Sequence, residues 1–202
     1  MNLKKGLVVL FVMLLASSCA VVDAMDYKGY VYSPRDKSFE VSFDAKPIVT
    51  TTNQGAYVSD PLKFPWGKLH MNVVLYPSRF TVEALYYADL PKEALAMDSA
   101  AFFEQLKTAR VAMLKETESH FKLKDLKFTN IAGYPAMTAR AVLIPADKAA
   151  ADYDKGPKKF CAVYRAILAN KRLYEIVVVN RDEMPSGAMI ELFMDTFKVL
   201  KK

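Results

Sequence analysis

The chain has 202 residues, of which 52% are apolar and 25% are charged, and its formal net charge is +6. This composition is typical of a folded globular domain and excludes a disordered or collagen-like chain. With only two cysteines and two histidines, the sequence also excludes a disulfide scaffold, an all-cysteine zinc site and a histidine-rich metal site.

The first residues have the pattern of an export signal. Lys4 and Lys5 precede an unbroken apolar run over residues 7–16. A helix needs about 20 residues to span a bilayer, so this run is too short to do so and fits the apolar region of a secretory signal peptide. We therefore expect the protein to be exported to the cell envelope.

The end of this signal resembles a bacterial lipobox, because small residues precede Cys19. By that resemblance, residues 1–18 are a signal peptide, Cys19 carries lipid and anchors the protein to the membrane, and residues 19–26 are a short tether. Ala16 stands where leucine is usual. Ala20 differs from the aspartate of inner-membrane retention, which favours the periplasmic side of the outer membrane in a Gram-negative host. Cleavage by signal peptidase I is the alternative, and it predicts a soluble periplasmic protein.

Strand patterns begin the mature part of the chain. Apolar residues alternate over Phe39–Phe43, and residues 48–52 are β-branched throughout, so both segments predict strands. Residues 68–76 and 80–87 predict two longer strands, and the short turn between them indicates an antiparallel hairpin.

The pattern becomes helical from Asp98 to about Glu118, with Asp98 or Ser99 placed to cap the first turn. Apolar residues of this segment share one face, which we expect to pack against the sheet: Phe102, Leu106, Ala109 and Met113.

Strand patterns return over residues 125–131, 136–144, 160–169 and 172–180, with a tight turn at 133–135 and a hairpin turn at 170–171. Pro185 and Ser186 open a short helix with an apolar face made by Met189, Ile190, Phe193, Met194 and Phe197. No linker divides the chain. Residues 27–202 therefore predict one α+β domain, an antiparallel β-sheet flanked by helices.

Four segments together resemble the PsbP-like superfamily: Phe39–Pro47, Val82–Pro91, the turn Gly133–Ala136 and Phe193–Phe197. The resemblance covers roughly residues 27–200 and implies an antiparallel sheet sandwiched by helices. Asp44 stands where the family often has proline, and residues 146–158 look like an insertion. The family implies no common enzymatic activity, since its known members act mostly by binding other macromolecules.

The sequence has no phosphate-binding glycine loop, no nucleophile elbow and no zinc motif, so we expect no enzyme activity and no cofactor. His70 and His120 are expected in surface or capping roles, the second at the predicted helix end. Asp147, Asp152 and Asp154 lie close together and offer oxygen ligands for Ca²⁺. Their spacing is not that of an EF-hand, and a polar loop is the simpler interpretation.

Cys161 lies in the apolar strand segment 160–163, where both faces are small or apolar. If Cys19 is lipidated, the chain offers Cys161 no disulfide partner. We therefore expect a buried, unpaired thiol of low reactivity.

Trp66 and Tyr153 are candidate recognition residues, because they lie in the loop segments 60–67 and 146–158 and such side chains dominate many interfaces. Trp66 plugging one end of the core is the alternative. Three functions stay open: a non-enzymatic envelope lipoprotein that binds a protein partner, an exported protein that binds a small ligand or a cation, and an unrecognised hydrolase. We favour the first, and nucleic acid is not expected as a partner.

Overall fold

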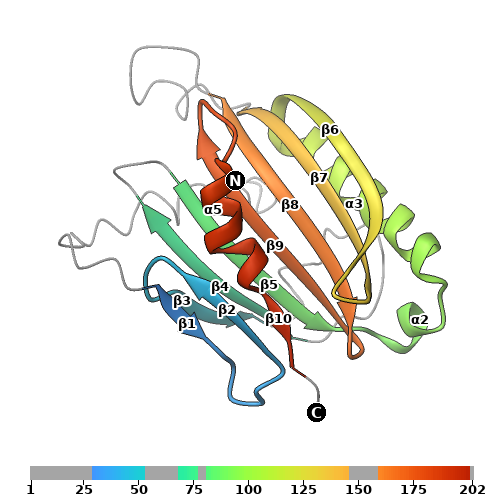
Figure 1. Ribbon diagram of the computed structural model, residues 1–202. Coiled ribbons are helices and arrows are strands. Elements are labelled where there is room, and N and C mark those ends of the chain that lie inside the picture. Colours follow the sequence, from blue (N-terminus) through green and yellow to red (C-terminus); the bar gives the residue numbers. More distant parts are fainter. Residues whose placement is uncertain (1–28, 53–67, 77–80, 146–158, 201–202) are drawn as a thin grey trace.

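A computed structural model describes residues 29–52, 68–76, 81–145 and 159–200. Its main element is an antiparallel sheet of seven strands in the order β3-β4-β5-β9-β8-β7-β6 (Figure 1). The strands are β3 (Ile48–Thr52), β4 (Leu69–Tyr76), β5 (Thr81–Asp89), β6 (Glu118–Ile131), β7 (Tyr134–Pro145), β8 (Phe160–Ala169) and β9 (Arg172–Arg181). After β5, the helices α2 (Lys92–Leu95) and α3 (Ser99–Thr117) carry the chain to the far edge at β6.

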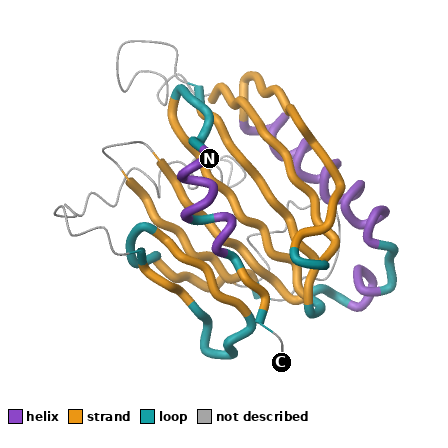
Figure 2. The backbone as a smooth tube through the Cα atoms, in the orientation of Figure 1, coloured by secondary structure: helices purple, strands orange, loops and turns teal. Residues whose placement is uncertain are grey.

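A smaller sheet covers one face of the large one. It consists of β1 (Tyr30–Tyr32), β2 (Phe39–Phe43) and β10 (Lys198–Val199) in the order β1-β2-β10. The helix α5 (Gly187–Leu192) and the 3₁₀ turn η3 (Met194–Thr196) lie on this same face, and α3 lies on the opposite one (Figures 1 and 2). The structure thus confirms an α+β domain with an antiparallel sheet flanked by helices.

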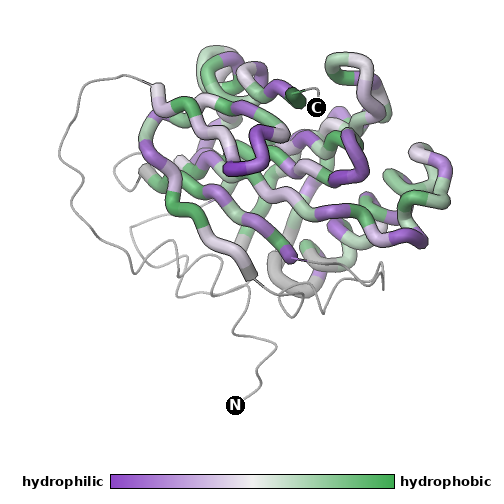
Figure 3. Tube along the Cα trace, turned by 90° about the horizontal axis from the view of Figure 1, so that it is seen from below, coloured by the Kyte–Doolittle hydropathy of each residue, from purple (hydrophilic) through white to green (hydrophobic). Residues whose placement is uncertain are grey.

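Strand alternation gives the large sheet two apolar faces. Along β9, Tyr174, Ile176 and Val178 face the small sheet, and Leu173 faces α3. Figure 3 shows hydrophilic and hydrophobic residues following one another along the strands. A sheet with apolar side chains on both faces needs a covering layer on each side, which explains the three layers.

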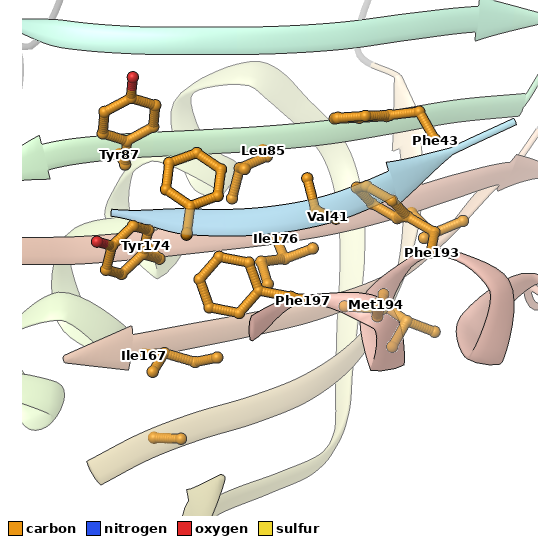
Figure 4. Packing of buried hydrophobic residues seen from close by; sticks show 14 of the residues in the cluster. Val41, Phe43, Leu85, Tyr87, Ile167, Tyr174, Ile176, Phe193, Met194 and Phe197 are labelled. Atoms are coloured by element: carbon orange, nitrogen blue, oxygen red, sulfur yellow. The ribbon is translucent and has the colours of Figure 1, made fainter. Parts of the chain in front are cut away.

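The core beneath the small sheet is rich in aromatic side chains (Figure 4). Phe39 of β2 is fully buried and touches four rings at centroid distances of 5.0–6.0 Å: Tyr32, Tyr87, Tyr174 and Phe197. Pairs of this kind add stabilisation beyond the area they bury. Phe39 therefore fixes the small sheet and the C-terminal segment onto the large sheet.

The core on the other face belongs to α3. Phe102, Phe103, Leu106 and Ala109 are buried against the sheet, as the helical stripe predicts; the side chain of Met113 lies outside the described residues. Asp98 caps the helix, because its Oδ2 accepts hydrogen bonds from the amides of Ala100 and Ala101 at 3.0 and 3.2 Å.

Two hairpins have the turn chemistry that their sequences indicate. Asn170 and Lys171 join β8 to β9 with φ of 49° and 62°, the conformation of a two-residue turn that matches the twist of the strands. Ala132 and Gly133 join β6 to β7 with φ of 51° and 84°. The predicted turn at 133–135 is thus displaced, because Tyr134 and Pro135 already pair with β6.

The structure corrects two further expectations. His120 does not end the helix but pairs with Ile144 inside β6, which begins at Glu118 rather than near Asp125. One strand has no counterpart among the predicted elements, since Tyr30 and Tyr32 lie in β1 and pair with β2. A strand of three residues carries almost no periodic signal, so pairing with β2 decides its conformation.

Candidate interaction site at the β1 and β3 edges

A row of polar and aromatic side chains crosses the sheet from its β3 edge. The register places Thr51, His70, Tyr87 and Tyr174 opposite one another on β3, β4, β5 and β9. The Thr51 hydroxyl lies 3.0 Å from Nδ1 of His70. The imidazole stacks on the Tyr87 ring with a centroid distance of 4.6 Å and an interplanar angle of 12°. The row therefore links the exposed edge to the buried core.

Arg172 holds the inner end of this row in place. Its guanidinium donates to Asp36 at 2.6 Å, to Asp89 at 2.5 Å and to the Ser38 hydroxyl at 2.7 Å. The same group lies over the ring of Tyr87, 5.7 Å from the centroid. Because these partners come from the β1–β2 turn and from the end of β5, Arg172 ties the small sheet to the large one.

The electrostatic environment follows from these contacts. Burial lowers the pKa of His70, and the nearby Arg172 charge lowers it further, so the imidazole is neutral at pH 7. Burial raises the pKa of Asp36, but hydrogen bonds from Ser38 and Arg172 outweigh burial and hold this pKa below its ordinary value. Burial also raises the pKa of Tyr87, which stays a phenol.

Thr51 and His70 resemble a nucleophile and its general base, yet no carboxylate completes the arrangement among the described residues. The two carboxylates whose charge acts on His70 are Asp36 and Asp89, and both are bound to Arg172. Catalytic triads require a third group that orients the imidazole.

Two uncharged strands, each at the edge of its own sheet, carry exposed apolar side chains. In β1, Tyr30 is 39% exposed and Val31 is 61% exposed; in β3, Ile48 and Val49 are 57% and 52% exposed. These four form half of the exposed large apolar side chains in the described part of the chain. With Thr50 and Thr51, also exposed, they are called the β1/β3 edge surface below.

The opposite edge of the sheet is different. β6 carries exposed Lys122, Lys124 and Lys127, and its register shifts twice. Lysines and bulges on an edge strand prevent another strand from pairing with it. β3 (IVTTT) and β1 (YVY) have neither lysine nor any other charge. Only the β1/β3 edge surface is therefore open to strand addition among the described strands of these two edges.

The predicted site residues lie largely outside the described residues. Cys19, Trp66, Tyr153 and the three aspartates Asp147, Asp152 and Asp154 fall in segments 1–28, 53–67 and 146–158. Segment 53–67, with Trp66, joins β3 to β4. Among the described residues, the structure shows no group of three or more potential metal ligands and no helix long and apolar enough to cross a membrane.

Cys161 is described, and it is buried with a free thiol whose pKa is raised by burial. The structure confirms the predicted burial of Cys161, and the low reactivity of the thiol stays a prediction. Sequence reasoning missed Arg172 and Asp36, because their partners are up to 136 residues away. A weak signal was present: a charged residue at position 172 opens a largely apolar strand directly after a turn.

Comparisons with known proteins find similar solved structures but no family. No family model matches the chain, and neither does any curated protein sequence. The cyanobacterial PsbP of Synechocystis sp. PCC 6803 is similar in structure, with a TM-score of 0.48, 9% identity, and coverage of 90% of this chain and 98% of that one. A protein of unknown function from Pseudomonas aeruginosa, described as a putative regulator, has a TM-score of 0.36 and 9% identity, with 80% and 85% coverage. Identity this low says nothing about what the chain binds.

Proposed function

We propose that this protein is an exported, non-enzymatic lipoprotein of the cell envelope that binds a protein partner through the β1/β3 edge surface. Cys19 anchors it to the membrane, and the partner adds an extended segment to β3. Trp66 belongs to the segment that follows β3 directly, so it remains a candidate for contact with the same partner.

The observation that carries this proposal is the exposure of Ile48 and Val49 on an uncharged edge strand. An edge strand offers a row of backbone donors and acceptors to an incoming strand, and its side chains supply specificity. Exposed apolar groups scattered singly are normal in proteins. Here two uncharged edge strands carry half of those in the described residues, and β6 shows that this chain protects its other edge.

The test is to place a charge on the edge. The variant Ile48→Lys/Val49→Lys keeps the fold, since both residues are more than half exposed and exposed substitutions cost about 0.5 kcal/mol or less. The control is Leu95→Lys on α2, where the replaced residue is 43% exposed. Quantitative co-purification from solubilised membranes of the native host should lose a defined partner with the edge variant and keep it with the control. Equal recovery of that partner with both variants would refute edge binding.

Lipidation is tested separately. Cells labelled with palmitate should incorporate the label into the wild-type protein and not into Cys19→Ser. If the wild-type protein takes up no label, the proposed lipid anchor at Cys19 is wrong, and cleavage by signal peptidase I is the interpretation that remains. Partner binding by the edge surface does not depend on this result.

A further inference from the structure

Three lysines of β6 lie on one face of the sheet because of a β-bulge. Lys122, Lys124 and Lys127 stand opposite Val142, Arg140 and Thr138 of β7. Side chains alternate along a strand, so residues 124 and 127 would ordinarily point to opposite faces. The register shift between them, with Asp125 at a φ of 51°, restores Lys127 to the face of Lys124.

This face is the one covered elsewhere by the small sheet and α5. Arg140 pairs with Val163 of β8, which belongs to the core beneath the small sheet. On the other face of β6, Phe128 stacks on Phe103 of α3. The basic strip, defined here as Lys122, Lys124, Lys127 and Arg140, therefore lies beside the small sheet.

Among the described residues, the ion pair of the basic strip joins Arg140 to Asp125. Lys124 stands directly opposite Arg140, and like charges in that position destabilise a sheet. Arg140 lies 3.7 Å from Asp125, but the two side chains are 52% and 59% exposed, so the pair contributes little. An anionic surface would relieve this repulsion.

Exposed apolar side chains accompany the strip. Ile144, 40% exposed, follows Arg140 and Val142 on the same face of β7, and Leu192 on α5 is 61% exposed. Cations beside exposed aliphatic groups are the combination by which proteins bind the interface of a bilayer. Gly29 and β1, where the described chain begins, belong to the layer on this same side of the sheet.

We propose that the basic strip docks the domain on a bilayer of anionic phospholipids. The orientation of the domain on the membrane depends on the lipid anchor at Cys19 that is proposed above. The eight residues 19–26 reach about 28 Å when extended, so the lipid and the strip can meet one membrane surface. Strand β3, at the opposite end of the large sheet from β6, then stays accessible to a partner.

Vesicle binding by the unlipidated chain tests this inference without lipidation or the partner. The chain from residue 19 with Cys19→Ser retains both cores, which begin at Phe39. It should sediment with vesicles containing 30% phosphatidylglycerol (a chosen composition, about one anionic lipid in three) and not with pure phosphatidylcholine. Lys122→Gln/Lys124→Gln should lower the partition coefficient by roughly 25-fold, since each cation near an anionic surface contributes about fivefold.

The control replaces two exposed lysines away from the strip, Lys92→Gln/Lys115→Gln on α2 and α3, and removes the same net charge. It should bind within about twofold of wild type. If both double variants lose the same amount of vesicle binding, net charge alone explains the binding and the proposal is overturned. Absence of binding to anionic vesicles, or tighter binding to polyglutamate than to vesicles, would overturn it as well. None of these results affects palmitate labelling or partner recovery, so the failure of this inference is distinguishable from failure of the proposed function.

Discussion

Arg172→Met tests whether the small sheet is held to the large one by the Arg172 network. Methionine keeps an apolar stem near the Tyr87 ring and removes every donor. Asp89 is 73% exposed, so water solvates its carboxylate when the ion pair is lost. The Arg172–Asp89 pair therefore contributes about 0–1 kcal/mol to the free energy of unfolding. Asp36 is 34% exposed and Ser38 is 4% exposed. Losing charge-assisted hydrogen bonds to these less exposed groups costs about 1.5–3 kcal/mol.

We therefore expect a total loss of about 2–3 kcal/mol in the free energy of unfolding. With a urea m-value of about 2 kcal/mol/M, the midpoint should fall by about 1–1.5 M. Lys171→Met is the matched control, because Lys171 is the exposed neighbour in the turn and carries the same charge. A loss below about 0.5 kcal/mol in Arg172→Met would refute the reasoning, since that is the effect of an ordinary surface change.

The difference in the free energy of unfolding between wild type and Arg172→Met should depend on pH in one direction. The folded pKa of Asp36 is lowered, so the stability gained from its pairing is fully present above the unfolded pKa of about 4 and is lost as the pH falls through the folded value. The gap between wild type and Arg172→Met should narrow in acid. A gap that stays constant down to about pH 2 would show that Asp36 is not the partner that matters.

Three other outcomes are expected. Leu106→Ala should cost about 2–5 kcal/mol in urea unfolding, because Leu106 is fully buried beneath α3; a cost under about 1 kcal/mol would mean that α3 does not pack as described. Cys161 should react with a thiol reagent only after denaturation, since it is 3% exposed and its pKa is raised; rapid labelling of the native protein would contradict this. His70 has a lowered pKa in the folded state, so wild type should lose stability as the pH falls below the unfolded value of about 6.5 while His70→Gln loses less; parallel pH curves for the two proteins would contradict it.

The sequence predicts well those elements whose apolar pattern repeats over several residues. The stripe of α3 and the alternation of β2 each span enough residues for one face to be recognised, and burial follows that face. Asn170–Lys171 is predictable for another reason, since a short polar turn between two apolar runs specifies its own hairpin.

The features that the sequence does not predict depend on contacts between residues that are far apart in the chain. β1 exists because β2 offers it backbone partners, and Arg172 acquires its role from Asp36, 136 residues earlier. The exposure of Ile48 and Val49 is equally invisible in the sequence, because a β-branched run reads the same at the centre of a sheet and at its edge. The order of the strands in the sheet decides whether such a run lies at the centre or at the edge.

The most direct test of partner binding is site-specific photo-crosslinking in the native host. A photoreactive phenylalanine at Val49 samples the β1/β3 edge surface, and the same group at Leu95 samples α2, two positions with 52% and 43% exposure. We expect a crosslinked adduct of one defined mass from position 49 and not from position 95, and we expect the adduct to disappear when Ile48→Lys is added. No adduct from position 49, or the same adduct from both positions, would contradict binding of a partner at this edge.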